Sequence, residues 1–263
     1  MGTILDTIIH EKQKEVKKLQ EQNLLKIESK PKRSLIQKLQ KADEIAIISE
    51  FKRASPSKGI INNGIEPAEQ AVRYEQAGAS AISVLTDSTF FKGSFSDLSA
   101  VREVVNLPIL CKDFMIDSSQ IDMAAKNGAD IILLIVAALD QKTLNDLYQY
   151  ARGMNLEVLV EVHNQSELEQ ALNLGAQLIG VNNRDLKTFN VSLEATETLA
   201  KTIKDAGAFL ISESGIHQKE DVERVRNAGA NGILVGEALM KSPDLAKSLQ
   251  EFRLPLKPGV VNK

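Results

Sequence analysis

The sequence contains no tryptophan, a single cysteine and only 4% aromatic residues. Cys111 alone cannot build a disulfide framework, nor can it supply a cysteine-rich zinc or iron–sulfur site. The scarcity of aromatic side chains argues against the base-stacking platforms of single-strand nucleic-acid binders and against aromatic cages for cations. The three histidines, His10, His163 and His217, are scattered without metal-binding spacing, so we expect no metal.

Strong charge imbalance and long apolar runs are also missing. Lys and Arg total 32 against 35 Asp and Glu, for a net charge of −3, which argues against a nucleic-acid partner. The most apolar stretch, Ile131 to Leu139, is far shorter than the roughly 18 to 20 residues that span a bilayer. Residues 1–6 carry no signal-peptide or lipidation pattern. We therefore expect a cytoplasmic protein that binds no membrane.

The N-terminal segment shows helical spacing of apolar residues over 3–22, with charged residues between them. Residues 10–41 include ten Lys or Arg, interleaved with Glu11, Glu15, Glu21 and Glu28. A stretch of this kind could contact a nucleic acid or an acidic membrane, but a solvated helix face is the simpler interpretation.

From residue 45 onward, short β-branched runs alternate with amphipathic stretches, the pattern of parallel βαβ units. The expected strands are 45–51, 80–85, 108–112, 130–136, 156–161, 177–182, 208–213 and 231–235. The expected helices include 66–77, 117–127, 140–152, 164–173, 192–205 and 217–228. Gly-Ala pairs, such as Gly128-Ala129, recur where a helix ends and a strand begins.

This repeat favours an α/β fold of the (β/α)8 TIM-barrel type over an open doubly wound sheet, whose G-x-G-x-x-G fingerprint is absent. We expect one structural domain overall. It would consist of an N-terminal helical extension over residues 1–44 and a barrel over residues 45–263.

Polar residues end several of the apolar runs, and in a barrel these ends meet at the active-site face. They are Glu50 (followed by Lys52), Lys112, Glu161, Asn182 and Glu213. Burying such groups is costly unless they are paired or used, so their shared position indicates a site. Strand alternation places Glu50 and Lys52 on one face and turns Phe51 and Cys111 toward the helices.

Three loops rich in glycine or serine suggest anion binding. They are Ser55–Gly59, Ser212–Ile216 and Val235–Met240. The last two follow the seventh and eighth expected strands, where barrels commonly hold a phosphate with backbone N–H groups. The substrate expected from these features is a small molecule that carries phosphate and carboxylate groups.

Several of these segments together closely resemble the indole-3-glycerol-phosphate synthase family of tryptophan biosynthesis. The matching segments are Ile48–Gly59, Phe90–Ser94, Leu107–Phe114, Leu159–His163, Gly180–Leu186, Ser212–Ile216 and Val235–Met240. The leading helices resemble the family's extra N-terminal segment, which lies over the barrel mouth. Ala238 replaces a common serine near the phosphate loop, but the catalytic pattern is complete.

The resemblance implies closure of 1-(2-carboxyphenylamino)-1-deoxyribulose 5-phosphate to indole-3-glycerol phosphate, with release of carbon dioxide and water and without cofactor. The catalytic residues implied are Lys112, Glu161, Lys52, Glu50, Asn182 and Glu213. Substrate contacts are implied for Ser55, Ser57, Phe114, Leu133, Arg184 and Phe189, and phosphate contacts for Lys52, Ser57, Ser214, Gly215, Gly236 and Glu237. Because some of the family's enzymes are fused to neighbouring pathway enzymes, association with other tryptophan-pathway enzymes is a partner expectation.

Two roles follow from the expected chemistry. Lys112 is expected to protonate the ketone oxygen, with its pKa lowered by nearby cations and apolar walls. Glu161 is expected to take the second acid–base role, with help from Lys52. Residues 53–64, which contain Gly59, Asn63 and Gly64, are expected to form a loop that closes over substrate.

Two alternatives stay open at this point. One is another phosphosugar barrel enzyme, such as phosphoribosylanthranilate isomerase, which is disfavoured because the first strand offers Glu50 and Lys52. The other is a non-catalytic phosphosugar-binding barrel, which would tolerate the loss of a catalytic lysine or carboxylate.

Overall fold

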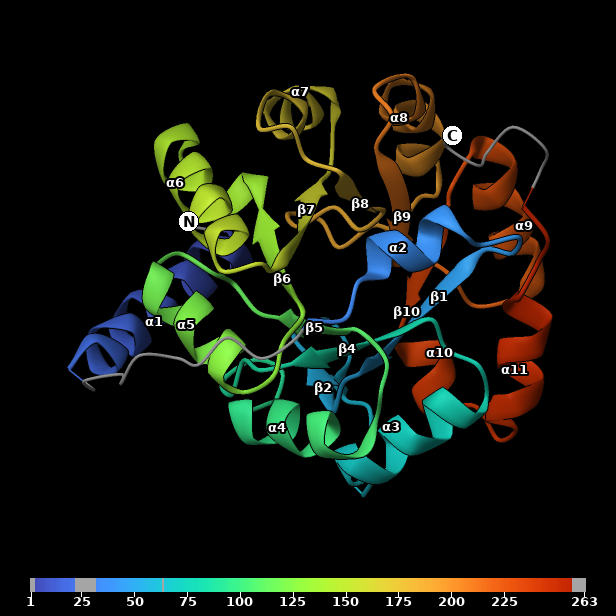
Figure 1. The fold of residues 1–263 in the computed structure, drawn as a ribbon, viewed down its shortest axis with the longest axis horizontal. Coiled ribbons are helices and arrows are strands. Elements are labelled where there is room, and N and C mark those ends of the chain that lie inside the picture. Colours follow the sequence, from blue (N-terminus) through green and yellow to red (C-terminus); the bar gives the residue numbers. More distant parts are fainter. Residues whose placement is uncertain (1–2, 22–31, 63, 257–263) are drawn as a thin grey trace.

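The computed structural model describes residues 3–21, 32–62 and 64–256. Eight parallel strands close into a barrel in the order β1-β10-β9-β8-β7-β6-β5-β4, with helices around it (Figure 1). The strands are β1 Ala46–Phe51, β4 Ala81–Leu85, β5 Ile109–Lys112, β6 Ile131–Ile135, β7 Glu157–Val162, β8 Leu178–Asn182, β9 Phe209–Glu213 and β10 Gly232–Val235. The predicted (β/α)8 barrel is confirmed, and each strand boundary agrees with the prediction to within one residue.

Most of the helices that follow the strands begin at a polar residue, and several are followed by a glycine. They are α3 Pro67–Gln76, α4 Phe95–Val104, α5 Ser118–Lys126, α6 Gln141–Gly153, α7 Gln165–Asn173, α8 Glu194–Asp205, α9 Lys219–Ala228, α10 Glu237–Met240 and α11 Leu245–Phe252, with a 3-10 turn η1 at Val136–Ala138. Asn164 caps α7 by accepting a hydrogen bond from the backbone N–H of Glu167. At helix ends, Gly128 and Gly229 have φ values of 94° and 122°, which favour glycine.

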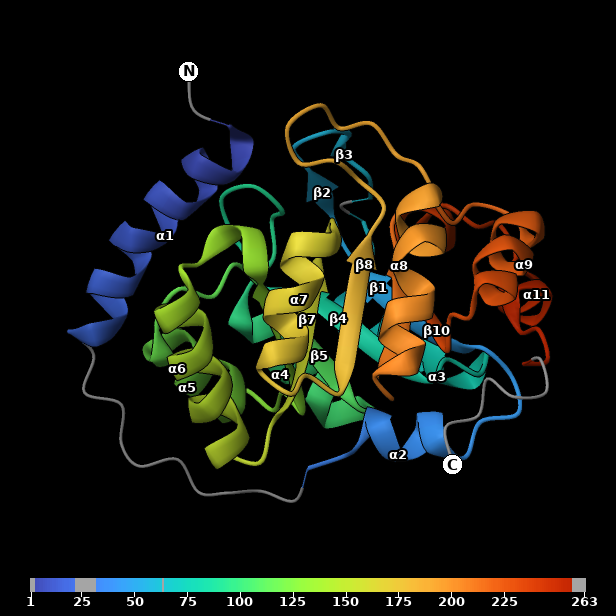
Figure 2. The same cartoon turned by 90° about the horizontal axis from the view of Figure 1, so that it is seen from above.

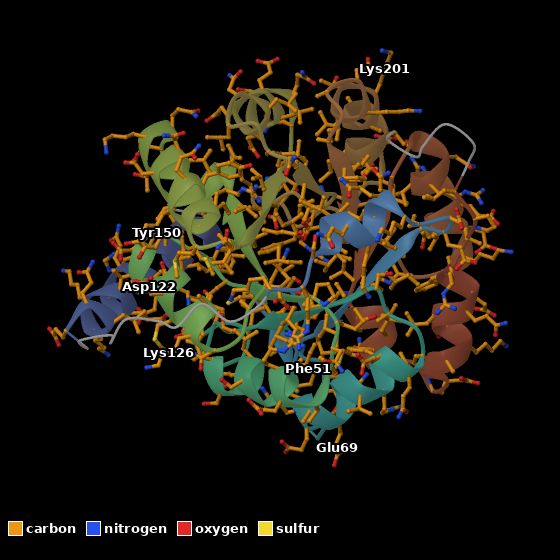
Figure 3. The ribbon with its side chains drawn as sticks, in the orientation of Figure 1. Phe51, Glu69, Asp122, Lys126, Tyr150 and Lys201 are labelled. Carbon is orange, nitrogen blue, oxygen red and sulfur yellow. The ribbon has the colours of Figure 1, made fainter. Side chains whose placement is uncertain are left out.

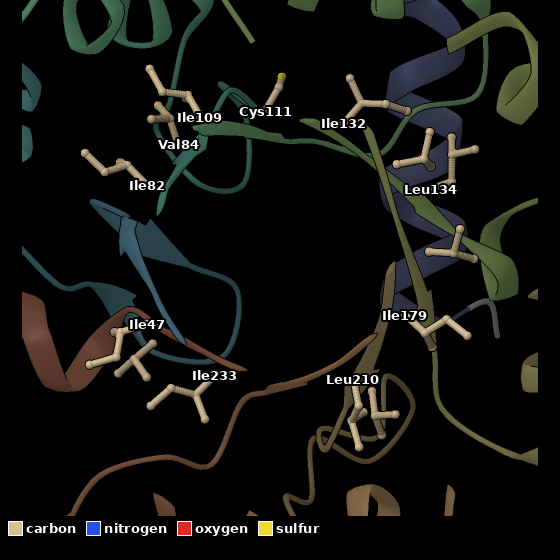
Figure 4. Packing of buried hydrophobic residues seen from close by; sticks show 14 of the residues in the cluster. Ile47, Ile82, Val84, Ile109, Cys111, Ile132, Leu134, Ile179, Leu210 and Ile233 are labelled. Carbon is tan, nitrogen blue, oxygen red and sulfur yellow. The ribbon is translucent and has the colours of Figure 1, made fainter. Parts of the chain in front are cut away.

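The core has two layers because strand side chains alternate between the two faces of the barrel wall. Residues such as Ile47, Val84 and Cys111 point away from the barrel axis and pack against the helices (Figure 4). A second cluster, which includes Ile48 and Leu159, fills the barrel interior. Phe51 and Cys111 thus both face the helices, as the alternation predicted.

The two N-terminal helices lie at opposite ends of the barrel. Helix α1 (Ile4–Gln20) places Ile4, Leu5 and Ile8 against the cavity at the carboxyl ends of the strands. The predicted N-terminal helix is present, and its first turns border the barrel mouth, while the rest of α1 lies beside α5 at the edge of the barrel.

Helix α2 (Leu35–Gln40) closes the other end, as Figure 2 shows. Its Leu35 and Leu39 complete the interior cluster. The carboxylate of Glu157, at the start of β7, accepts hydrogen bonds from the Leu35 and Ile36 backbone N–H groups at 2.9 and 3.2 Å. The sequence pattern does not predict that α2 closes this end of the barrel.

The basic face of α1 is not uniformly solvated, which corrects the simple interpretation of this stretch. Lys14 is exposed, but the Lys12 side chain is only 1% exposed and lies 2.8 Å from both Asp87 and Asp113. These two aspartates follow β4 and β5, so Lys12 pins α1 to loops at the mouth of the barrel. Lys26, Glu28 and Lys30, which also belong to the predicted basic stretch, lie outside the described residues.

The predicted loop 53–64 contains a small antiparallel hairpin, β2 (Ala54–Ser55) and β3 (Gly59–Ile60). At its base the Arg53 guanidinium stacks on Phe51, 4.9 Å from the ring centre, and donates to Asp97 of α4 at 3.0 Å. The hairpin therefore leaves the barrel from an anchored base. Asn63 lies outside the described residues.

Charged side chains such as Glu69, Lys126 and Lys201 project from the outer helices, whereas Phe51 lies inside the ring of helices (Figure 3). On the same outer surface the Tyr150 hydroxyl donates to Asp122, linking α6 to α5. None of the helices within the described residues has the length and apolar character that crossing a membrane requires.

Candidate active site

One cavity at the carboxyl ends of the strands collects every site residue predicted from the sequence. Its lining includes Glu50, Lys52, Ser55, Ser57, Lys112, Phe114, Leu133, Glu161, Asn182, Arg184, Phe189, Glu213, Ser214, Gly215, Gly236 and Glu237. These residues come from strand ends and loops spread over the whole barrel. The roles assigned to them stay predictions, but their shared location agrees with those roles.

Lys112 lies at the centre of the site, between two buried carboxylates. Its ammonium is 3.1 Å from Glu161 Oε2 and also contacts Glu213 Oε2. The Asn182 side chain donates to Glu161 Oε1 at 3.0 Å and accepts the Arg184 backbone N–H at 3.1 Å. The side chains at the ends of β5, β7, β8 and β9 thus form one connected network of hydrogen bonds and ion pairs.

The expectation that cations lower the pKa of Lys112 is wrong. Burial does lower the pKa of this ammonium, but the carboxylates of Glu213, Glu161 and Glu50 outweigh burial and raise its pKa above the usual value. The neighbours of Lys112 are anions because the acidic residues at the other strand ends point into the same interior. Lys112 is therefore fully protonated at neutral pH.

The two carboxylates beside Lys112 shift in opposite directions. Burial raises the pKa of Glu161, but the Lys112 ammonium, the His163 imidazole and the Asn182 amide together lower its pKa below the usual range. Burial raises the pKa of Glu213 to about 7, helped by repulsion from Glu161 and Glu50 and opposed by Lys112. Environments that separate the pKa values of neighbouring carboxyls are typical of acid–base sites.

A second lysine–carboxylate pair lies at the carboxyl end of β1. Lys52 contacts Glu50 Oε1, and both side chains face the cavity, as strand alternation predicted. The Glu50 side chain needs Gly236 beside it, because a Cβ at Gly236 would lie 2.4 Å from Glu50 Oε1. Gly236, predicted only as a phosphate contact, thus also makes room for this carboxylate.

The proposed phosphate end of the cavity is formed by the loops after β9 and β10. Ser214 and Gly215 turn with φ values of 65° and 83°, and Gly236 precedes the short helix α10. The Glu237 carboxylate pairs with Lys241 at 2.8 Å, so a contact to an anion from Glu237 would come from its backbone. This position is where barrels commonly bind phosphate.

Several lining residues were not predicted. Ile4, Leu5 and Ile8 reach the cavity from α1, and Phe91 packs against Phe114 with ring centres 6.0 Å apart. The sequence shows the apolar stripe of α1, but it does not show that this stripe packs against the active-site cavity. No cluster of three or more potential metal ligands occurs among residues 3–21, 32–62 and 64–256.

These features define a (β/α)8-barrel enzyme with an acid–base site of lysines and carboxylates at the carboxyl ends of its strands. A sequence model described as indole-3-glycerol phosphate synthase matches residues 5–252. The chain belongs to the indole-3-glycerol phosphate synthase family. The match to this family favours the synthase interpretation over another phosphosugar barrel enzyme and over a non-catalytic phosphosugar-binding barrel.

Curated relatives agree over nearly the full length. The chain is 51% identical over 255 residues to indole-3-glycerol phosphate synthase of Bacillus cereus, covering 97% of this chain and 99% of the relative. It is 53% identical over 254 residues to the Bacillus anthracis protein of that name, with the same coverage of 97% and 99%.

Solved structures of more distant proteins share the fold alone. Thiamine phosphate pyrophosphorylase from Pyrococcus furiosus matches with a TM-score of 0.61 at 19% identity, covering 83% of this chain and 96% of that one. 3-Hexulose-6-phosphate synthase matches with a TM-score of 0.60 at 17% identity, covering 79% and 98%.

Proposed function

We propose that this chain is a carbon–carbon lyase (carboxy-lyase) that closes 1-(2-carboxyphenylamino)-1-deoxyribulose 5-phosphate to indole-3-glycerol phosphate. The observation that carries the proposal is the Lys112 ammonium held between Glu161 and Glu213 inside the cavity. The family membership and this arrangement support the same reaction. The reaction's net change is loss of carbon dioxide and water, which needs proton transfers and no redox partner.

In the first step the aryl carbon that carries the carboxylate attacks the ketone carbon, and Lys112 protonates the ketone oxygen. A lysine with a raised pKa remains charged until an alkoxide develops, and an alkoxide is basic enough to take its proton. The two flanking carboxylates keep Lys112 in place and protonated. Breakage of the bond to the carboxylate then restores the aromatic ring and releases carbon dioxide.

In the second half of the reaction the new hydroxyl leaves as water and the carbon beside the nitrogen loses a proton. Glu161 is the proposed base for that proton, because its lowered pKa keeps it ionised at neutral pH. Lys52, held by Glu50, is the proposed donor to the leaving hydroxyl and a contact for the substrate's anionic groups. Asn182 orients Glu161, and Arg184, at the cavity wall, is the proposed contact for the anthranilate portion of the substrate.

The remaining contacts are assigned by position along the cavity. Ser57, Ser214, Gly215, Gly236 and the Glu237 backbone are proposed to surround the phosphate. Ser55, Phe114, Leu133 and Phe189 are proposed to contact the rest of the substrate, with the apolar ones beside its aryl ring. Oriented donors of this kind contribute several kcal/mol to lowering a barrier.

The test is a direct assay. Purified protein is mixed with 1-(2-carboxyphenylamino)-1-deoxyribulose 5-phosphate in the presence of EDTA, and indole fluorescence is followed. We expect a steady rise that requires the protein. A signal no greater than that of a buffer blank, from protein shown by circular dichroism to be folded, would refute the proposed function.

A further inference from the structure

A chain of ionisable side chains leads from the cavity to the outside of the barrel, and His163 lies in its middle. His163 follows β7 directly, and its Nε2 lies 3.5 Å from Glu161 Oε1. Its Nδ1 lies 2.9 Å from Glu167 Oε2 on α7. Because Glu161 contacts Lys112 at 3.1 Å, four groups connect α7 to the centre of the barrel.

His163 separates the active-site cavity from a second, polar cleft outside the barrel wall. Glu161 lines only the active-site cavity, and His163 lines only the outer cleft. The outer cleft lies between the loops after β7 and β8, and its other lining residues include Asn164, Asp185 and Asn190. Asn182 and Arg184 line both cavities, and the Asn182 amide also contacts Glu161, but an amide does not exchange an acid proton at neutral pH. The imidazole is therefore the proton-carrying group that lies between Glu161 and the outer cleft.

The ring is fixed in an orientation that aims its second nitrogen at Glu161. Glu167 Oε2 accepts a hydrogen bond from the His163 backbone N–H at 2.8 Å. The same oxygen also accepts a hydrogen bond from the ring at Nδ1. Asn164 holds the other Glu167 oxygen at 2.7 Å. Nε2 is buried and makes no hydrogen bond within the described part of the chain, which is unusual for a buried ring nitrogen. Contacts between catalytic groups are often long before substrate binds, and 3.5 Å is such a distance.

The charges around His163 favour its protonated form. Carboxylates face it from three elements: Glu161 on β7, Glu167 on α7 and Glu213 on β9. Arg184 and Asp185 border the outer cleft, and Lys112 reaches it only through Glu161. Burial lowers the pKa of His163, but the three carboxylates outweigh burial and raise its pKa above the usual value.

The proposed reaction, on which this inference rests, needs a proton from outside in every turnover. The ketone oxygen leaves as water after gaining two protons, whereas the carbon beside the nitrogen gives up one. The carboxylate leaves as neutral carbon dioxide. One substrate carboxylate anion and one proton therefore give product, carbon dioxide and water, and the lysines must be recharged by that one proton.

We propose that His163 relays this proton from the outer cleft through Glu161 to Lys112. The imidazolium of His163 passes its Nε2 proton to Glu161 Oε1, and Glu161 passes a proton from Oε2 to the Lys112 amine. The neutral ring keeps its Nδ1 proton on Glu167. Nε2 then regains a proton from solvent when the ring, which lines the outer cleft, turns briefly toward it. His163 is then a relay and positioning residue that touches no substrate. The route lets Lys112 be reprotonated without opening the mouth of the barrel.

The test compares His163→Gln and His163→Ala with the wild type and with His10→Gln, a histidine exposed on α1. Steady-state kcat and KM are measured from pH 5.5 to 9. We expect kcat of both His163 variants to fall about 10-fold or more, with KM nearly unchanged, and His10→Gln to match the wild type. We also expect added imidazole to restore kcat of His163→Ala, whereas pyrazole, which has the same shape but stays unprotonated at neutral pH, does not.

The outcomes separate the relay from the proposed function. An active wild type with unchanged kcat in His163→Gln would overturn the relay and leave the function standing. A lowered kcat that imidazole fails to restore, or that pyrazole restores equally, would show a merely structural ring and also overturn the relay. A folded wild type without synthase activity would overturn the function and, with it, the relay.

Discussion

Gly180 on β8 makes room for the carboxylate of Glu213 on β9. A Cβ built on Gly180 would lie 2.1 Å from Glu213 Oε1, closer than any real contact of that kind. Because Glu213 also contacts Lys112, the absence of a side chain at Gly180 sets the geometry at the centre of the site. This glycine lies inside a strand, where glycine is otherwise unfavourable.

We therefore predict that Gly180→Ala lowers kcat by about 10²-fold, because Glu213 must turn away and lose its contact with Lys112. The end of a glutamate side chain can move, so the barrel should still fold. The matched control is Gly153→Ala at the end of α6, where an added Cβ meets nothing within 4 Å. The indole fluorescence assay gives kcat, and urea unfolding gives stability. Wild-type kcat in Gly180→Ala would contradict the positioning role.

Replacing the central lysine tests the acid directly. We predict that Lys112→Met lowers kcat by about 10²- to 10⁴-fold, the range expected for loss of a general acid. The variant leaves Glu161 and Glu213 without their shared cation, so their pKa values should rise and part of the site should become neutral.

Two further variants complete this test. Glu161→Gln keeps the shape of the side chain but removes the base, and it should also lose kcat by orders of magnitude. Lys126→Met, an exposed change on α5, should behave like the wild type. Circular dichroism establishes that each variant is folded. Near-wild-type turnover in Lys112→Met or Glu161→Gln would reject the role of that residue.

The barrel and its site residues could be predicted because the deciding signals are local. A strand buried on both faces consists of a short apolar run. A charged residue at the end of such a run is therefore easy to recognise in the sequence, as with Lys112 and Glu161. Parallel strands in a barrel bring such ends together whatever their separation in sequence.

The features that escaped prediction depend on contacts between distant segments. Lys12 has the sequence context of a solvated lysine, and its burial depends on Asp87 and Asp113, which lie far along the chain. The sequence shows that Leu35 and Leu39 lie on one apolar face. It does not show that this face packs into the closed end of the barrel. The pKa of Lys112 was predicted with the wrong sign, since only the structure places three carboxylates around it.

The raised pKa of Glu213 has a consequence for stability. Its pKa rises from 4.5 to about 7 on folding, so between these values the folded protein holds a proton that the unfolded chain has lost. Stability therefore falls as pH rises from about 4.5 to about 7, by up to roughly 3 kcal/mol for this group. Glu213→Gln cannot titrate and should lack this loss.

The measurement is the free energy of unfolding in urea at pH 5, 6, 7 and 8. We expect the wild type to lose more stability over this range than Glu213→Gln. The exposed Glu69→Gln on α3 serves as the control and should follow the wild type. Parallel curves for the wild type and Glu213→Gln would mean that Glu213 titrates in its ordinary range.

The hairpin of β2 and β3 is expected to close over substrate, as the glycine and asparagine content of residues 53–64 predicted. Its tip is exposed and its base is anchored through Arg53. We predict that a non-reactive substrate analogue slows amide hydrogen exchange at Ser57 to Ile60. The turn at Asn127–Ala129, at the opposite end of the barrel, should not change. Identical exchange at the hairpin with and without analogue would rule out its closure.

Lys12 tests whether α1 is part of the active site. The Asp87 carboxylate that it contacts also accepts the Phe90 and Phe91 backbone N–H groups at 2.6 and 3.1 Å, which fixes the turn that carries Phe91 into the cavity. Asp113 likewise accepts the Thr86 hydroxyl at 2.6 Å. One buried cation thus holds both the helix and one wall of the cavity.

We predict that Lys12→Met lowers the free energy of unfolding by about 3 to 5 kcal/mol, because it leaves the two buried carboxylates of Asp87 and Asp113 without their cation. It should also raise KM, because Ile4, Leu5 and Ile8 of α1 no longer cover the cavity. Lys14→Met, two residues along the same helix, removes only an exposed pair with Glu11 and should change stability by less than about 1 kcal/mol. Urea unfolding and the fluorescence assay measure both effects. If Lys12→Met lost stability but kept the wild-type KM, α1 would be a structural support with no share in substrate binding.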